Sequence, residues 1–337
     1  MSIRFTATGL STGDGTRRQV LVEFPDSVLR GIGQVMLQDS SYAGLLFLIG
    51  IFYNSVLFGL GVVVGTAVST ATAMLLGAER PLVRAGMFGF NGALVAVALL
   101  YFLEPDLLTW VCLVFGGICA SVVTAALLKS LKVWNLPVLT APFVFTALGF
   151  FLAIARFGRL HSTHLLPTAG LPSSVAVEGV VTAATVLQGL FNGVAQVFFQ
   201  ASFVTGILFA AGLLISSRRA CAAALLGSLT GLLVAWGLGA AEPAIRAGAF
   251  GFNSVLTAIA LASVFFAPNA GSLVYAAIAT IATAVVYAAL SAALQPLGVP
   301  ALTFPFVLVV WIFLLASRMF PRIHARVDAR HALQSRD

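Results

Sequence analysis

Long runs of residues without a charge alternate with short charged segments along this chain. A helix needs about 20 apolar residues to cross the hydrocarbon core of a membrane, and most of these runs reach that length. The runs cover residues 40–78, 85–103, 107–128, 133–155, 179–217, 220–241 and 247–317. The pattern predicts about ten membrane-spanning helices, five in each half of the chain.

Three runs are too long for one helix and are expected to break where polar residues, proline and glycine gather. The first run holds two spans with a break near Tyr53–Ser55. The last run holds three spans, with breaks near Ala267–Gly271 and Gln295–Pro300. The run at 179–217 predicts one long or interrupted span.

The composition favours an all-α polytopic membrane protein. The chain is 60% hydrophobic and only 9% charged, whereas a soluble domain has about 25% charged residues. A net charge of +7 could indicate a nucleic-acid partner, but the basic residues occupy the ends of the chain and short loops rather than one stripe. We therefore expect membrane lipid around the protein and no nucleic acid.

The basic residues also predict the orientation of the spans, because short cytoplasmic loops are enriched in Lys and Arg. With the N-terminus inside, most of them fall on the cytoplasmic side, and only Arg156, Arg159 and Arg246 fall on the other side. Residues 1–28 contain no hydrophobic segment like that of a signal peptide. We expect residues 1–28 and 319–337 to be cytoplasmic tails.

Three blocks of sequence occur twice, in the same order. RAGMFGFNGALVAVAL at 84–99 returns 162 positions later as RAGAFGFNSVLTAIAL at 246–261. GIGQVMLQDS at 31–40 matches GVAQVFFQAS at 193–202. NLPVLTAPF at 135–143 matches GVPALTFPF at 298–306, with one more residue between the copies. The chain therefore consists of two homologous halves, residues 29–160 and 178–318, joined by a loop at 161–177.

An odd number of spans in each half predicts an inverted repeat. Two such halves enter the membrane from opposite sides and are related by a pseudo-two-fold axis in the membrane plane, where transporters and channels place the solute path. The glycine-rich start of each RAGxFGFN block predicts a half-helix that dips into the membrane, so the fifth crossing would come from near residue 31. A duplicated scaffold without a transport path is the alternative.

The chemistry of the spans favours a neutral solute. The charge-free runs contain no Asp, Glu, Lys, Arg or His, although coupled carriers usually keep an ionisable group in the membrane. No general acid, general base or metal site can be assembled there, so we expect neither an enzyme nor a cofactor.

Several residues in the repeated blocks form matched pairs. Thr and Gln side chains can hydrogen-bond a polar solute, although each could instead bond its own helix or join two helices. We interpret the pair Asn91 and Asn253 mainly as a cap or loop brace. Two Phe rings that meet at the axis would form a slot for a flat molecule. The candidate pairs are Gln34 with Gln196, Phe90 with Phe252, Leu94 with Leu256, and Thr140 with Thr303.

These residues resemble the urea transporter family over about residues 29–318. LPVLTAPF and VPALTFPF are similar to the duplicated LPxxTxPF signature of that family, and GFNGALV is similar to its half-helix motif. The resemblance implies two inverted five-helix repeats with two re-entrant pore half-helices. It also implies a homotrimer with one pore per subunit, in a bacterial inner membrane, that carries urea passively.

The resemblance also implies roles for single residues. Thr140 and Thr303 would line a constricted site in the middle of the pore. Leu94 and Leu256 would form its apolar walls, Phe90 and Phe252 the aromatic slots, and Gln34 and Gln196 would offer amide oxygens to N–H groups. Phe199 would complete one slot, whereas its counterpart is Leu37, where family members often carry an aromatic residue.

Other functions stay open at this point. A channel for another small neutral solute, such as a short amide, ammonia or water, would use the same uncharged path. A coupled secondary transporter would need an ion-binding site within the spans. Flux measurements would separate both from a membrane scaffold that transports nothing.

Overall fold

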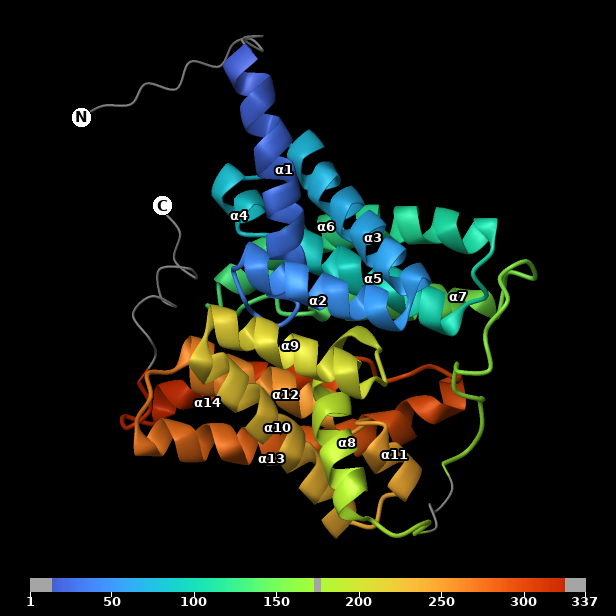
Figure 1. Cartoon of the computed structure of the whole chain (residues 1–337), viewed down its shortest axis with the longest axis vertical. Coiled ribbons are helices and arrows are strands. Elements are labelled where there is room, and N and C mark those ends of the chain that lie inside the picture. Colours follow the sequence, from blue (N-terminus) through green and yellow to red (C-terminus); the bar gives the residue numbers. More distant parts are fainter. Residues whose placement is uncertain (1–13, 173–176, 325–337) are drawn as a thin grey trace.

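The computed structural model describes residues 14–172 and 177–324, with side chains described from residue 23 onward. The outer parts of both predicted tails, residues 1–13 and 325–337, lie outside the described residues, as do residues 173–176 of the connecting loop. The described chain is built from helices (Figure 1). The prediction of an all-α polytopic membrane protein is confirmed.

The two halves contain matching α-helices in the same order, and the second half also has short 3₁₀-helical and π-helical segments. The first half comprises α1 (Asp14–Gln34), α2 (Ser41–Asn54), α3 (Val56–Leu75), α4 (Arg80–Arg84), α5 (Gly89–Phe102), α6 (Leu107–Lys132) and α7 (Ala141–Ile154). The second comprises α8 (Ala183–Ala195), η1 (Gln196–Phe198), α9 (Phe203–Ser216), α10 (Arg218–Gly237), α11 (Glu242–Arg246), α12 (Gly251–Ala258), η2 (Ile259–Phe265), α13 (Ala270–Leu294), η3 (Gln295–Leu297), α14 (Phe304–Ala316) and η4 (Ser317–Met319).

The halves lie one above the other in Figure 1 and meet along α2 and α9. The rings of Phe47 and Phe209 are 5.1 Å apart across this boundary, and both side chains are fully buried. Asn54 Nδ2 donates a 2.7 Å hydrogen bond to Gln200 Oε1 between the same two regions. Apolar packing and this polar contact therefore join the halves into one body.

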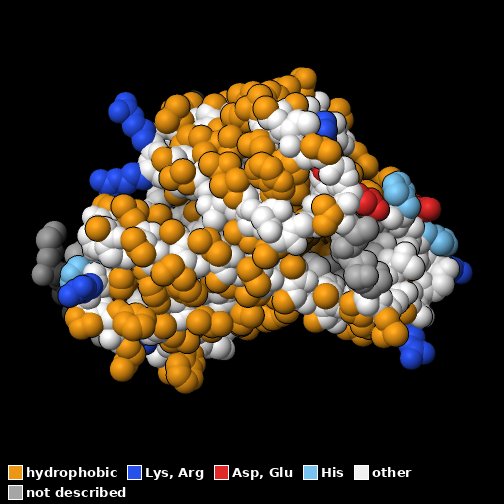
Figure 2. All heavy atoms as spheres, turned by 90° about the horizontal axis from the view of Figure 1, so that it is seen from below, with side chains coloured by type: hydrophobic (Ala, Val, Ile, Leu, Met, Phe, Trp, Pro, Cys, Tyr) orange, Lys and Arg blue, Asp and Glu red, His pale blue; other side chains and the backbone are white. Residues whose placement is uncertain are grey.

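The outside of the protein is largely apolar, as a membrane requires. Figure 2 shows hydrophobic side chains spread over the visible face, with most Lys and Arg side chains near its edges. In the described part of the chain, five helices are long and apolar enough to cross a membrane, or six if the broken pair α8–α9 counts as one. The axes of this pair are bent by 73° at the break.

The predicted breaks are confirmed, whereas only five or six of the about ten predicted spans are described as single helices long and apolar enough to cross a membrane. Ser55 ends α2 and caps α3, where its hydroxyl accepts a 3.3 Å bond from Phe58 N. However, α5 and α7 have only 14 residues each, about 21 Å at 1.5 Å per residue, against about 30 Å for the hydrocarbon core. Hydropathy does not distinguish a helix that begins inside the fold from one that crosses it.

The predicted boundary at residue 28 falls inside α1, which begins at Asp14. Polar contacts hold this helix against the start of α2. Arg30 Nε donates a 2.7 Å bond to Asp26, the Ser41 hydroxyl donates to the same carboxylate, and Arg30 Nη1 contacts Asp39 at 2.6 Å. Partial burial opposes ionisation of Asp26, but the bonds from Ser41 and Arg30 outweigh it and lower the pKa of Asp26.

A π-helical segment explains the extra residue in the second half. The distance between matching residues is 162 at Arg84 and Arg246, and 163 at the helix caps Asp106 and Asn269. Between these points α12 continues as the π-helical η2. A π-helix carries one more residue per hydrogen-bonded turn than an α-helix, so we infer that the insertion is accommodated there.

Close helix contacts depend on matched glycines. A Cβ atom on Gly44 of α2 would overlap the carbonyl oxygen of Leu29 in α1, and one on Gly206 of α9 would overlap that of Phe191 in α8. Because backbone cannot move aside as a flexible side chain can, these helices approach closely only without a side chain at the crossing.

We expect Gly44→Ala and Gly206→Ala each to destabilise the folded protein by about 1–3 kcal/mol, the usual cost of overpacking. Thermal unfolding in detergent measures the effect. Gly149→Ala in α7 is the control, because a Cβ atom there would meet nothing within 4 Å. Equal midpoints for all three variants would contradict the close-contact explanation.

Candidate functional site

Two threonines from opposite halves meet in the interior. Thr140 Oγ1 and Thr303 Oγ1 lie 2.6 Å apart, although 163 positions separate the residues, and each residue is 2% exposed. Thr140 immediately precedes α7 and Thr303 immediately precedes α14, and neither side chain bonds the N–H groups of its own helix. The structure therefore brings together the two residues that were predicted for the middle of a path.

An asparagine in each half holds the turn that positions each threonine. Leu139 and Leu302 have φ values of 49° and 51°, in the left-handed region that bulky residues rarely adopt. Asn91 Nδ2 lies 3.4 Å from Leu139 O, and Asn253 Nδ2 donates to Leu302 O at 3.1 Å. Each asparagine therefore holds the carbonyl oxygen of a strained residue.

The same asparagines cap the helices that follow. Asn91 Oδ1 accepts a 3.0 Å bond from Phe143 N, and Asn253 Oδ1 accepts a 3.2 Å bond from Phe306 N. These N–H groups belong to the first turns of α7 and α14, which have no partner within their own helix. The interpretation of Asn91 and Asn253 as braces is confirmed.

The predicted glutamines have one end of their amide engaged. Gln34 Nε2 donates to Ala85 O at 2.9 Å, and Gln196 Nε2 donates to Ala247 O at 3.2 Å. Both glutamines are half-buried. Because the N–H groups fix the amide plane on the RAG loops, the side-chain oxygens are left in a position to accept hydrogen bonds.

Phe199 lies among rings of the other half. Its ring centroid is 5.3 Å from Tyr101, 5.8 Å from Phe102 and 6.4 Å from Phe143. Phe199 adopts φ 60°, as its counterpart Leu37 adopts φ 59°. The backbone is thus the same in both halves, and only the side chain differs.

Phe252 stands edge-on to Tyr287, with the ring centroids 5.4 Å apart. Its counterpart Phe90 is buried and belongs to the same apolar core as Leu94 and Leu256, which are both almost fully enclosed. The predicted wall residues therefore lie inside the protein and not on its lipid-facing surface.

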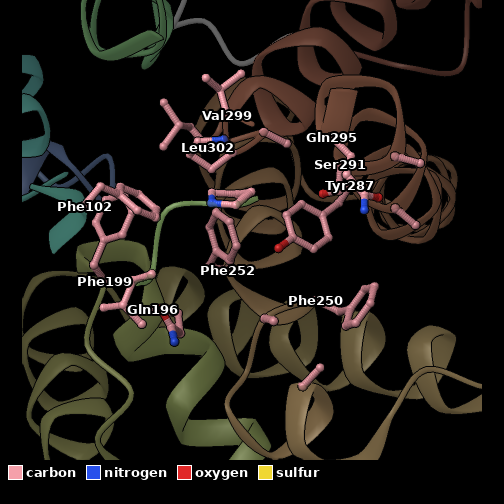
Figure 3. Close-up of a pocket in the computed structure, with 18 of the residues that line it drawn as sticks. Phe102, Gln196, Phe199, Phe250, Phe252, Tyr287, Ser291, Gln295, Val299 and Leu302 are labelled. Carbon is pink, nitrogen blue, oxygen red and sulfur yellow. The ribbon is translucent and has the colours of Figure 1, made fainter. Parts of the chain in front are cut away.

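A cavity of about 690 Å³ opens beside these residues (Figure 3). Its lining includes three predicted residues, Gln196, Phe199 and Phe252, and Leu302, the neighbour of Thr303. No charged side chain belongs to its described lining. The remaining predicted residues do not line it: Gln34, Leu37, Phe90, Leu94, Thr140, Leu256 and Thr303.

Comparison of the two halves missed several residues that line this cavity. Tyr101 has Ser263 or Val264 at the matching position, and Tyr287 has Thr124. A search for duplicated residues does not find side chains that one half alone carries. The only available signal was the presence of tyrosines within otherwise apolar runs.

Ion pairs flank the repeated loops without entering the cavity. Arg84 pairs with Glu23 at the start of one loop, and Arg246 Nη2 lies 2.6 Å from Glu242 at the start of the other. Among residues 14–172 and 177–324, no group of three or more His, Cys, Asp or Glu residues could hold a metal ion.

Truncation of the asparagine braces tests their role. We expect Asn91→Ala and Asn253→Ala each to destabilise the protein by about 1–3 kcal/mol, because each leaves a buried N–H group unpaired. Thermal unfolding provides the measurement, and Ser130→Ala, which removes an exposed hydroxyl that bonds only the backbone of its own helix, provides the control. A loss no greater than that of the control would contradict a bracing role.

Known proteins similar to this chain point to one family. The model of a family described as "Urea transporter" matches residues 25–318. Urea transporter 1 of Ovis aries is 32% identical over 308 residues, which cover 90% of this chain and 79% of that protein. Urea transporter 1 of Mus musculus is 30% identical over 331 residues, which cover 95% of this chain and 86% of that protein.

Proposed function

The chain belongs to the urea transporter family, and we propose that it carries urea passively, as a channel, through a path within each subunit. Urea transport across a membrane is the function of this family, and the chain is a transport protein rather than an enzyme. The proposal adds the mechanism: an uncharged path through the threonine pair, without coupling to an ion gradient.

The observation that carries the proposal is the contact between Thr140 and Thr303. A hydroxyl both donates and accepts, so the pair can exchange its mutual 2.6 Å bond for bonds to a solute carbonyl or N–H group. Because this exchange replaces hydration without creating a deep trap, it suits rapid passage. An ion would lose far more hydration energy than two hydroxyls return.

Residues on either side of the pair supply selection in this proposal. Leu94 and Leu256 form apolar walls on either side of the path. These walls leave no room for a solute that keeps its full hydration shell. Phe199 and Phe252 form one flat slot, and Phe90 with Leu37 forms the other. The amide oxygens of Gln34 and Gln196 accept N–H groups, and their engaged Nε2 atoms support this orientation.

The inverted arrangement is part of the same proposal. Residues 29–160 and 178–318 would be related by an axis in the membrane plane, so that one half forms each mouth. The identical order of elements and the matched asparagine bonds support it. We further propose a homotrimer in a bacterial inner membrane, with both termini cytoplasmic, from the resemblance and from the placement of basic residues.

Removal of both hydroxyls tests the channel. We expect Thr140→Val with Thr303→Val to lower urea flux into liposomes about tenfold in stopped-flow measurements, because each lost neutral hydrogen bond is worth about 0.5–1.5 kcal/mol. Thr146→Val is the matched control on α7, since this buried hydroxyl has no hydrogen-bond partner. Wild-type flux should need no proton or sodium gradient and should exclude glycerol.

Three results would count against this mechanism. Wild-type flux equal to that of empty liposomes would remove the transport function itself. Flux that requires an ion gradient would replace the channel by a coupled carrier. A double variant as active as the wild type would place the constriction elsewhere.

The leucine at position 37 favours passage of short amides besides urea. A side chain without a ring leaves one slot less completely walled by aromatic faces than the slot of Phe199 and Phe252. We expect Leu37→Phe to reduce the flux of acetamide more than that of urea, because the added ring narrows the slot for a methyl group. Leu45→Phe on the exposed face of α2 is the control, and an unchanged acetamide-to-urea ratio would contradict the idea.

A further inference from the structure

One mouth of the protein carries polar side chains that the duplication does not explain. Tyr287, Ser291 and Gln295 follow one another at intervals of four residues along α13 and into η3, and all three line the cavity. Residues four apart lie on the same face of a helix. The matching positions on α6 hold Thr124, Leu128 and Lys132, so the other half carries neither the phenol hydroxyl nor the amide at these positions.

Tyr287 is held so that its hydroxyl meets the cavity. Its ring stands edge-on between Phe250 and Phe252, with both centroids 5.4 Å away. Figure 3 shows the hydroxyl pointing into the space beside Phe252, with Ser291 and Gln295 further along the same wall. The phenol is therefore oriented by its ring and is not merely filling space.

The connection between the halves forms another wall of the cavity. Leu165, Pro167 and Thr168 belong to its lining. Gly170 N contacts Gln295 O at 3.3 Å, and Ser162 forms a β-bridge with Leu103 at the end of α5. Because a chain of two halves has only one such connection, this segment covers the cavity at one mouth. Within the described residues, no equivalent segment covers the opposite mouth.

We propose that this cavity is an outer binding site for small planar amides, adjacent to the slot of Phe199 and Phe252 and present at one mouth only. This inference rests on the proposed urea channel. The Tyr287 hydroxyl donates to the carbonyl oxygen of the solute, and the amide oxygens of Gln196 and Gln295 accept its N–H groups. A cavity of about 690 Å³ also has room for several waters, at about 30 Å³ each, so the solute can exchange its hydration stepwise.

Tyr287→Phe tests the site, because it removes one oxygen and keeps the ring between its two neighbours. Urea uptake into urea-free cells and urea efflux into urea-free medium are measured separately. All copies of the protein in these cells share one orientation in the membrane. We expect the half-saturating urea concentration to rise about two- to tenfold for flux that enters at this mouth, the effect of one neutral hydrogen bond. Flux that enters at the opposite mouth should keep its half-saturation.

Tyr275→Phe is the matched control, since it removes a hydroxyl of the same helix that bonds Phe313 O at 2.9 Å and does not line the cavity. Unchanged half-saturation in Tyr287→Phe, an equal change in both directions, or the same change in Tyr275→Phe would overturn the outer site. Absence of wild-type flux would instead refute the proposed channel, so the two failures are distinguishable.

Discussion

The helices α7 and α14 begin in the interior of the protein, and their unpaired N–H groups must find partners there. Asn91 and Asn253 provide these partners from the neighbouring helices α5 and α12. At membrane depth, a backbone group without a partner cannot hydrogen-bond to water. Irregular backbone therefore persists there only where other parts of the protein supply the hydrogen bonds. The same asparagines also hold Leu139 and Leu302, whose left-handed turns bring the threonines together. The central contact therefore depends on two amide side chains that do not take part in it.

The rest of the architecture serves this interior. Glycines let α1 and α2, and α8 and α9, approach closely enough to enclose the short helices. Charged pairs hold the RAG loops from outside, so that charges stay away from the cavity lining. The protein thus separates two tasks, because ionic contacts fix the ends of segments while neutral hydrogen bonds organise the middle.

The sequence predicted those features that the duplication repeats. The break at Ser55 and the pairing of the two threonines follow from local composition and from matching blocks. Helix length was harder, because α5 and α7 are as apolar as full spans and only their position in the fold shortens them. The sequence did not identify Tyr101 and Tyr287 as lining residues. Their position depends on which side chains face the cavity, and neither residue is repeated in the other half.

The π-helical segment η2 has a consequence for how the two halves diverged. One extra residue in an α-helix rotates all that follows by about 100°, which would turn the next cap and helix to the wrong side. In η2 the wider turn takes up this rotation, so that Asn269 still caps α13 as Asp106 caps α6. The π-helical segment therefore confines the effect of a one-residue insertion to a single turn. The neighbouring elements keep their rotational positions although the chain between them has become longer.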